Sequence, residues 1–274
     1  MVLAALPVSI SPSRITTFTD CPRMFQYQAI DRLEQPPTIW TLKGNLVHAA
    51  LEGLFTAAPG LRTEELALER LREASTDDAF TEELVALGLE GVSATEFVDD
   101  AATLVRNYFA LEDPTTVDAV GVELRLETTL EIGGGLEAVP LRGIIDRLDR
   151  DEHGDLVVVD YKTGRAPGPG RERSKLAGVE TYALLCERVL GVRPVAVRLL
   201  YLRAPLIVER AVAPTTVARQ ERRAVGVWRA IAKAHALGSF RPSPGPLCNY
   251  CAFADRCEGA LLTGVAGRTS RAAS

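Results

Sequence analysis

A run of four apolar residues at 156–159, followed directly by Asp160-Tyr161-Lys162, constrains the fold more than any other segment. A short, mostly β-branched apolar run is typical of a strand that other elements cover on both faces. Side chains two residues apart on a strand lie on the same face. Asp160 and Lys162 are therefore predicted to share one face at the end of a buried strand, with Tyr161 on the other.

The residues before this strand have the apolar spacing of helices. Ser13 is expected to cap a first short helix, and Cys21-Pro22 to begin a second. Further helical segments are predicted at 43–57 and at 63–111, the latter with breaks near Thr76 and Gly91. From Val120 the period changes to two, which predicts strands. The remaining predicted elements are a hairpin at 120–148 turning at 133–135, a helix at 174–190, strands at 195–202 and 207–212, and a helix at 215–236.

This order predicts an α/β fold: a mixed central sheet flanked by helices, with an N-terminal helical segment. We take residues 1–274 as a single domain, with 63–113 as a helical insertion and 259–274 as a frayed tail. No GxxxxGK[ST] motif and no GxGxxG at a strand-to-helix turn is present, which excludes an intrinsic ATP-driven motor.

Asp146 follows Gly143-Ile144-Ile145, and we place it at the corresponding end of the strand before Asp160. Two carboxylates and a backbone carbonyl, for which we assign Tyr161, make an oxygen site suited to Mg²⁺ or Mn²⁺. The ammonium of Lys162 would orient a water on that ion. His48, on its predicted helix, would add a nitrogen ligand and favour manganese.

A plainer interpretation exists for each of these residues. A D-x-K sequence alone is usually a solvated strand edge, and a lone histidine is usually a hydrogen-bonded one. Lys162 is one of four lysines in an arginine-rich chain, and both aspartates follow apolar runs. These facts favour a metal site.

The cysteines suggest a second metal site. Cys248, Cys251 and Cys257 form C-x2-C-x5-C, and a closed four-ligand site needs a fourth thiolate. Cys21, at a predicted helix start, is preferred over Cys186, which lies in an apolar helix. Zinc and an iron-sulfur cluster both fit. The distant fourth cysteine favours iron-sulfur, because structural zinc ribbons have two close pairs.

Composition narrows the partners and the compartment. The net charge is −5, but basic side chains outnumber acidic ones after residue 150, so a polyanion would meet the second half. Arg165, Arg171 and Arg173 are expected phosphate contacts. Neither a secretory signal nor a membrane anchor is expected, and the five cysteines fit a reducing compartment, which predicts a cytoplasmic protein.

Taken together, these motifs resemble the RecB-type branch of the PD-(D/E)XK nuclease superfamily. Within it they resemble the iron-staple nucleases, which include the AddB nuclease domain and CRISPR-associated adaptation nucleases. The resemblance extends from Ser11 to Cys257. The matching stretches are SPSRITTFTDCPRMFQY, GNLVHAALE, RGIIDRLDR, VVVDYKTG, TYALL and CNYCAFADRC.

The resemblance implies a restriction-endonuclease-like sheet and assigns roles to individual residues. His48, Asp146 and Asp160 match the metal-binding residues of the family, and Lys162 matches its catalytic lysine. Tyr182 matches the tyrosine of a DNA-contacting Q-x3-Y helix motif, but Gly178 stands where the glutamine is expected and Glu180 is a substitute only by proximity. The ligands of a 4Fe-4S cluster would be Cys21, Cys248, Cys251 and Cys257.

The implied function is that of a stand-alone, metal-dependent DNA exonuclease acting in repair, recombination or processing on DNA that is single-stranded or has free ends. The alternative is a catalytically silent iron-sulfur subunit that grips DNA ends for a helicase partner in trans. The intact set of His48, Asp146, Asp160 and Lys162 favours the enzyme, and the missing glutamine favours the subunit.

Overall fold

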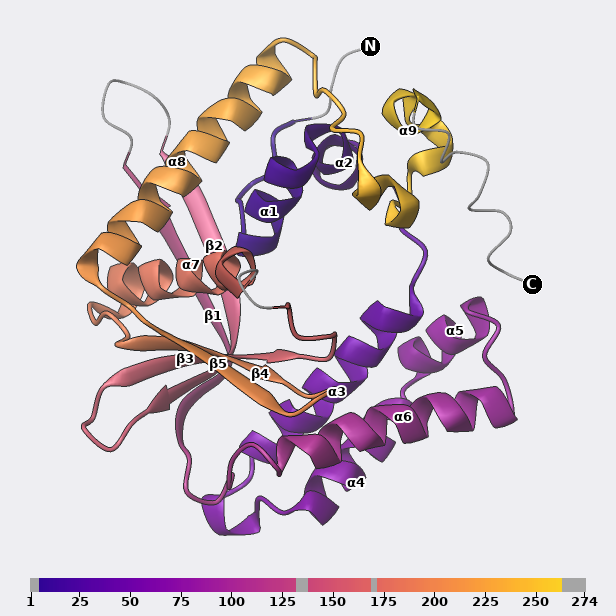
Figure 1. Ribbon diagram of the computed structural model, residues 1–274, viewed down its shortest axis with the longest axis vertical. Helices are drawn as coiled ribbons and strands as arrows, with labels where there is room; N and C mark the ends of the chain where they lie inside the picture. The colour runs from indigo at the N-terminus through magenta and orange to yellow at the C-terminus, as the bar shows by residue number, and fades with distance from the viewer. Residues whose placement is uncertain (1–4, 132–137, 169–171, 263–274) are drawn as a thin grey trace. The chain divides into compact units, whose positions relative to one another are not determined.

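The computed structural model describes residues 5–131, 138–168 and 172–262, with the backbone alone at 172–175. Helices come before the strands along the chain, as the periodicity predicts (Figure 1). The helices are α1 (Pro12–Asp20), α2 (Pro22–Phe25), the π-helical η1 (Gln26–Ile30), α3 (Ile39–Phe55), η2 (Pro59–Leu61), α4 (Glu64–Ser75), α5 (Asp78–Ala86), α6 (Val92–Tyr108), α7 (Glu172–Leu190), α8 (Pro214–Ala236), η3 (Pro246–Tyr250), η4 (Ala254–Arg256) and α9 (Glu258–Leu262). The strands are β1 (Asp118–Leu130), β2 (Val139–Arg150), β3 (Leu156–Lys162), β4 (Ala196–Tyr201) and β5 (Leu206–Ala211).

The helix boundaries follow local signals, with one correction. The breaks near Thr76 and Gly91 are confirmed, and Gly91 adopts a φ of 54°, a left-handed conformation that favours glycine. Ser13 is not the cap of α1. Ser11 is the N-cap and accepts a hydrogen bond from the Arg14 amide at 3.3 Å, because Pro12 supplies the first helical residue.

The strands form one mixed sheet in the order β1-β2-β3-β4-β5, which confirms the predicted fold class. β3 is central: it pairs antiparallel with β2, with Arg147 opposite Val159, and parallel with β4, with Asp160 opposite Leu199. The predicted turn at 133–135 lies outside the described residues, as does the predicted frayed tail from residue 263 onward.

The position of Asp146 in its strand differs from the prediction. β2 continues to Arg150, so Asp146 lies inside the strand and not at its end. The strand is longer because its turn into β3 is held by Asp151, whose carboxylate accepts hydrogen bonds from the amides of His153 and Asp155, both at 2.9 Å.

Contacts divide the chain into two compact units. The first comprises Met1–Pro36, Glu127–Arg142 and Ala218–Ser274, and the second comprises Pro37–Leu126 and Gly143–Val217. The single-domain organisation of 1–274 and the status of 63–113 as an insertion stay predictions.

The second unit has a three-layer arrangement. Helices α3, α4 and α6 pack against one another, and their core continues onto Val157, Val159 and Tyr161 of β3. α7 packs against β3 and β4, and Figure 1 shows it on the side of the sheet opposite α3 and α6. Both faces of β3 are thus covered, as its apolar run predicts.

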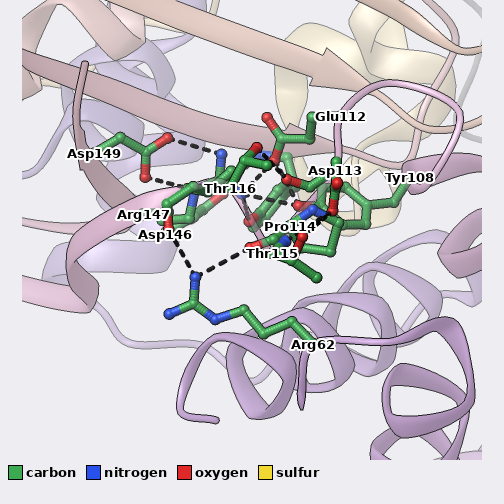
Figure 2. Close-up of polar contacts among 12 residues, drawn as sticks. Arg62, Tyr108, Glu112, Asp113, Pro114, Thr115, Thr116, Asp146, Arg147 and Asp149 are labelled. Atoms are coloured by element: carbon green, nitrogen blue, oxygen red, sulfur yellow. Dashed lines mark hydrogen bonds and ion pairs between the residues drawn. The ribbon is translucent and has the colours of Figure 1, made fainter. Parts of the chain in front are cut away.

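A buried polar network lies on the α3–α6 side of β3 (Figure 2). The Arg147 side chain is fully buried and donates two hydrogen bonds of 2.8 Å to the Asp149 carboxylate. Its Nη1 also lies 2.6 Å from Glu112 Oε1 and donates to the Tyr161 hydroxyl at 2.8 Å. Tyr108 donates to the same Glu112 oxygen at 2.6 Å. The network therefore fixes Tyr161, the residue between Asp160 and Lys162.

The first unit has an aromatic core of its own. The rings of Phe18 and Phe25 meet edge-on at 5.4 Å, and the ring of Phe240 stacks on Phe25 at 6.3 Å. Ile10 forms a parallel bridge with Leu141. None of the described helices has the length and apolar composition that spanning a membrane requires.

Candidate active site

Three potential metal ligands converge in the second unit. One ligand atom each from His48, Glu123 and Asp146 lies within 4.8 Å of the others. His48 comes from α3, Glu123 from β1 and Asp146 from β2. An imidazole and two carboxylates at this separation have the donor set of a divalent cation site.

Asp146 is positioned from two sides. Its Oδ2 accepts a hydrogen bond from the Tyr161 amide at 2.8 Å and lies 3.5 Å from Nδ1 of His48. Burial raises the pKa of the Asp146 carboxyl to about 7, and the nearby charge of Asp160 raises it further than the charge of His48 lowers it. It is the amide of Tyr161 that contacts Asp146, and a metal-binding role for its carbonyl stays a prediction.

Asp160 and Lys162 form an ion pair on one face of β3, as their spacing predicts. Asp160 is buried, and its Oδ2 accepts no hydrogen bond from the described residues apart from this pairing. Burial by itself lowers the pKa of Lys162, but the charge and hydrogen bond of Asp160 outweigh it and the pKa is raised. Lys162 is therefore an ammonium beside the aspartate pair, and Asp160 is outside the group formed by His48, Glu123 and Asp146.

Sequence reasoning missed Glu123. Alternation along β1 assigned it simply to a polar strand face, but its φ is 44°, a left-handed conformation that is uncommon for a residue other than glycine. Such a residue bends a strand locally and re-aims its side chain. Burial raises the pKa of Glu123, and the charge of His48 opposes that shift. No signal in the strand period marks this bend.

The three ligand candidates open onto a groove. A cavity of about 440 Å³ is lined by residues of α3, β1 and β2. Its walls include Thr41, Gly44 and Asn45 beside the three ligand candidates. The groove gives solvent and a substrate access to the carboxylates.

Tyr182 of α7 lies beside the same carboxylates. A Cβ at Gly143 would come within 2.8 Å of the Tyr182 ring, so this glycine allows the close approach of α7 to β2. Burial and the charges of Asp160 and Asp146 raise the pKa of the Tyr182 hydroxyl, which is therefore neutral. Its role in binding substrate stays a prediction.

The glutamine position of the same helix is open. Nothing among the described residues lies within 4 Å of a Cβ at Gly178. Glu180 is buried and accepts a hydrogen bond from Arg210 of β5 at 3.2 Å, so its carboxylate is already engaged within the fold.

In the first unit, four cysteines line one small cavity. Cys21, Cys248, Cys251 and Cys257 are all unpaired thiols on its wall. The Ser243 amide donates to Cys21 Sγ at 3.4 Å, although the two residues are 222 positions apart. Burial raises the pKa of Cys251, and the other three cysteines add to that shift. Cys186 is buried in α7, where burial raises its pKa to about 12.

The profile of the PD-(D/E)XK nuclease superfamily matches residues 9–258, nearly the whole chain. The chain belongs to the PD-(D/E)XK nuclease superfamily. Members of this superfamily use divalent metal ions, which agrees with the group of His48, Glu123 and Asp146.

Two kinds of known protein are similar to this PD-(D/E)XK chain. One of the subunits of ATP-dependent helicase/deoxyribonuclease, from Streptococcus agalactiae strains of serotypes Ia and V, is 26% identical over 160 residues. That match covers 57% of this chain and 14% of the relative, so the chain corresponds to a small part of it. A solved structure from Eubacterium rectale, described as a candidate exonuclease, has a TM-score of 0.53 at 11% identity and covers 89% of this chain and 86% of its own. It supports the fold.

Proposed function

We propose that the protein is a metal-dependent DNA nuclease of the RecB type that hydrolyses phosphodiester bonds as an exonuclease. The observation that carries this proposal is the convergence of His48, Glu123 and Asp146 beside the Asp160–Lys162 ion pair at the wall of an open groove. Three separate elements, α3, β1 and β2, supply the first three residues, so the grouping requires the tertiary fold.

Each residue has a distinct role in the proposal. Asp146 and Asp160, with His48 and Glu123, would hold Mg²⁺ or Mn²⁺, which stabilises the charge that develops on the scissile phosphate. Lys162, held by Asp160, orients the attacking water for in-line displacement. The Tyr161 amide fixes Asp146, and the Tyr182 hydroxyl is placed to donate to a phosphate oxygen.

Cleavage of linear and circular DNA tests this function. Purified protein with Mn²⁺ or Mg²⁺ should degrade linear single-stranded DNA labelled at one end, leave circular single-stranded DNA intact, and lose activity in Asp160→Asn and Lys162→Ala. Lys233→Ala, which removes a lysine from α8, should cleave like the native protein. Binding of DNA ends without cleavage under any divalent ion would contradict the enzyme and favour a silent end-binding subunit, the alternative that Gly178 supports.

The four cysteines of the first unit support a second part of the proposal, a 4Fe-4S cluster with a structural role. Tetrahedral zinc with Zn–S bonds of about 2.3 Å requires sulfur atoms about 3.8 Å apart. Within the described residues, His48, Glu123 and Asp146 form the one group of three with ligand atoms within 4.8 Å, so the cysteine sulfurs are more widely spaced. A four-iron cluster, with one thiolate on each iron, accommodates the wider spacing.

The DNA substrate and any partner belong to the same proposal. Similarity to part of a helicase/deoxyribonuclease supports DNA as the substrate and a helicase acting in trans as a partner. Arg165 is exposed near the catalytic strand and fits the predicted phosphate contact, whereas Arg171 and the side chain of Arg173 lie outside the described residues. We propose a cytoplasmic location on the cysteine chemistry.

A further inference from the structure

We propose that Trp40 is a base-stacking platform that holds single-stranded DNA in a cavity adjoining the catalytic groove. The inference rests on the proposed nuclease function and names the form of DNA that this site accepts. It adds a binding surface in the second unit that is separate from the carboxylates and from Lys162.

The cavity has a volume of about 640 Å³, larger than the groove beside the carboxylates. It is formed by α3, α6 and the segments that follow β3 and β4. The residues that matter here are Trp40, Lys43, Asn107, Thr163, Arg165 and Arg203. The lining thus combines one large aromatic ring with three cationic side chains.

The ring of Trp40 is unusually accessible. Trp40 is 65% exposed, whereas Trp228, the other tryptophan of the chain, is 6% exposed. Lys43 Nζ lies 5.7 Å and the Arg203 guanidinium carbon 5.8 Å from the Trp40 ring centre. A tryptophan in this setting offers a flat apolar face next to positive charge, the combination on which proteins stack the bases of single strands.

The cations around the ring are available to phosphates. Among the described residues, neither Arg165 nor Arg203 has a carboxylate within ion-pairing distance, and both are exposed. Lys43 is paired with Asp100 and serves mainly to fix the rim. Two unpaired guanidinium groups beside an aromatic face match a strand whose bases stack and whose phosphates point outward.

The cavity leads toward the catalytic residues. Thr163, on its wall, follows Lys162 directly, and the carboxylate groove begins at Gly44, one residue after Lys43. A Cβ at Gly44 would contact the Thr163 hydroxyl at 3.5 Å, so the glycine leaves the rim between the two hollows low. Trp40 and His48 are eight residues apart on α3, about 12 Å along the helix axis. This distance is a few nucleotides of extended strand.

The chemistry of stacking specifies an unpaired strand. Bases within a duplex already stack on each other and offer no free face, whereas an unpaired base can place its ring on Trp40. Stacking is tolerant of sequence because every base has such a face. The platform therefore selects single-stranded DNA without selecting its sequence.

Binding to fluorescein-labelled oligo(dT), measured by anisotropy with EDTA present to prevent cleavage, tests the platform. We expect Trp40→Ala to weaken binding by about 5- to 150-fold, and Trp40→Phe to retain most of the affinity. Ile39→Ala removes the neighbouring exposed apolar side chain of α3 and should bind within about twofold of the native protein. Oligo(dT) should also quench tryptophan emission in the native protein but not in Trp40→Phe, which retains the buried Trp228.

Three outcomes would overturn the platform: native affinity in Trp40→Ala, no binding of oligo(dT) by the native protein, or equal competition by blunt duplex DNA. The nuclease proposal fails separately. If Trp40→Ala loses binding but the native protein cleaves no DNA with Mn²⁺, the platform stands and the nuclease does not. If the native protein cleaves single strands and Trp40→Ala has an unchanged KM, the nuclease stands and the platform does not.

Discussion

Asp146 combines burial with a position between an imidazole and a second carboxylate. Its raised pKa, about 7, means that a proton occupies the carboxyl in the metal-free protein at mildly acidic pH. A metal ion must displace that proton, so metal binding and pH are linked at this residue.

We therefore expect the apparent affinity for Mn²⁺ to rise with pH by up to about tenfold per unit and to level off above about pH 7. Titration calorimetry at a series of pH values measures this. Asp146→Asn should bind weakly with a flatter profile, and Asp151→Asn, at an exposed turn, should follow the native curve. A native profile that is flat between pH 5.5 and 8 would contradict the assignment.

The same shift has a consequence for folding. An unfolded aspartate has a pKa of about 3.9, well below that of the folded carboxyl. The contribution of Asp146 to the stability of the metal-free protein is therefore present below about pH 4 and is lost as the pH rises through about 7. Metal bound to the carboxylate offsets that loss.

Arg147 is the second residue on which much depends, because two carboxylates and two tyrosine hydroxyls meet at its guanidinium. Arg147→Met would leave Glu112 and Asp149 without their cation in a buried site. We expect it to lower the free energy of unfolding by about 3–5 kcal/mol. Urea denaturation measures the change.

Arg150→Met is the matched control. Arg150 is on the same strand and pairs with Asp118 at 3.2 Å, but both side chains are more than half exposed. Its loss should change the free energy of unfolding by no more than about 1 kcal/mol. Equal effects of the two substitutions would show that the buried network has no special importance.

At the scale of elements, α7 presents an open glycine at the position where the resemblance implies a DNA-contacting glutamine. Gly178→Gln fits, since nothing described lies within 4 Å of its Cβ. Replacing glycine in a helix interior should raise the free energy of unfolding by about 0.5 kcal/mol. We also expect tighter binding of single-stranded DNA, measured by anisotropy.

Gly226 in α8 offers the control because a Cβ there also meets nothing within 4 Å of the described residues. Gly226→Gln should stabilise the protein by a similar amount and leave DNA affinity unchanged. If both substitutions affect DNA affinity alike, position 178 has no specific part in binding.

At the scale of the whole molecule, segments distant in sequence meet at the cysteine cavity. Protein purified without oxygen should be brown and contain about four iron atoms per chain. Cys251→Ser should lose iron and melt at a lower temperature, because ligation of the folded state contributes to stability. Iron analysis and thermal denaturation measure both effects.

Cys186→Ala separates ligation from cysteine loss in general. Cys186 is buried in the apolar part of α7 and should keep its full iron content when replaced, although the smaller side chain lowers stability modestly. Zinc in place of iron in the native protein would contradict the cluster.

The sequence by itself determined the helices, the strands and their order, because apolar periodicity is a local property of the chain. It also identified His48, Asp146, Asp160 and Lys162, since a charged pair after an apolar strand is visible in a few adjacent residues. The grouping of these residues required their strands to pair in one register, and that register depends on the whole sheet.

Only the tertiary structure decided the remaining features. The left-handed turn that aims Glu123, the continuation of β2 past Asp146 and the cavity around Trp40 each depend on contacts between residues far apart in sequence. A strand bend leaves the apolar period intact, and an exposed tryptophan looks like any other aromatic in a helical pattern. Their placement is fixed by packing, which no local pattern records.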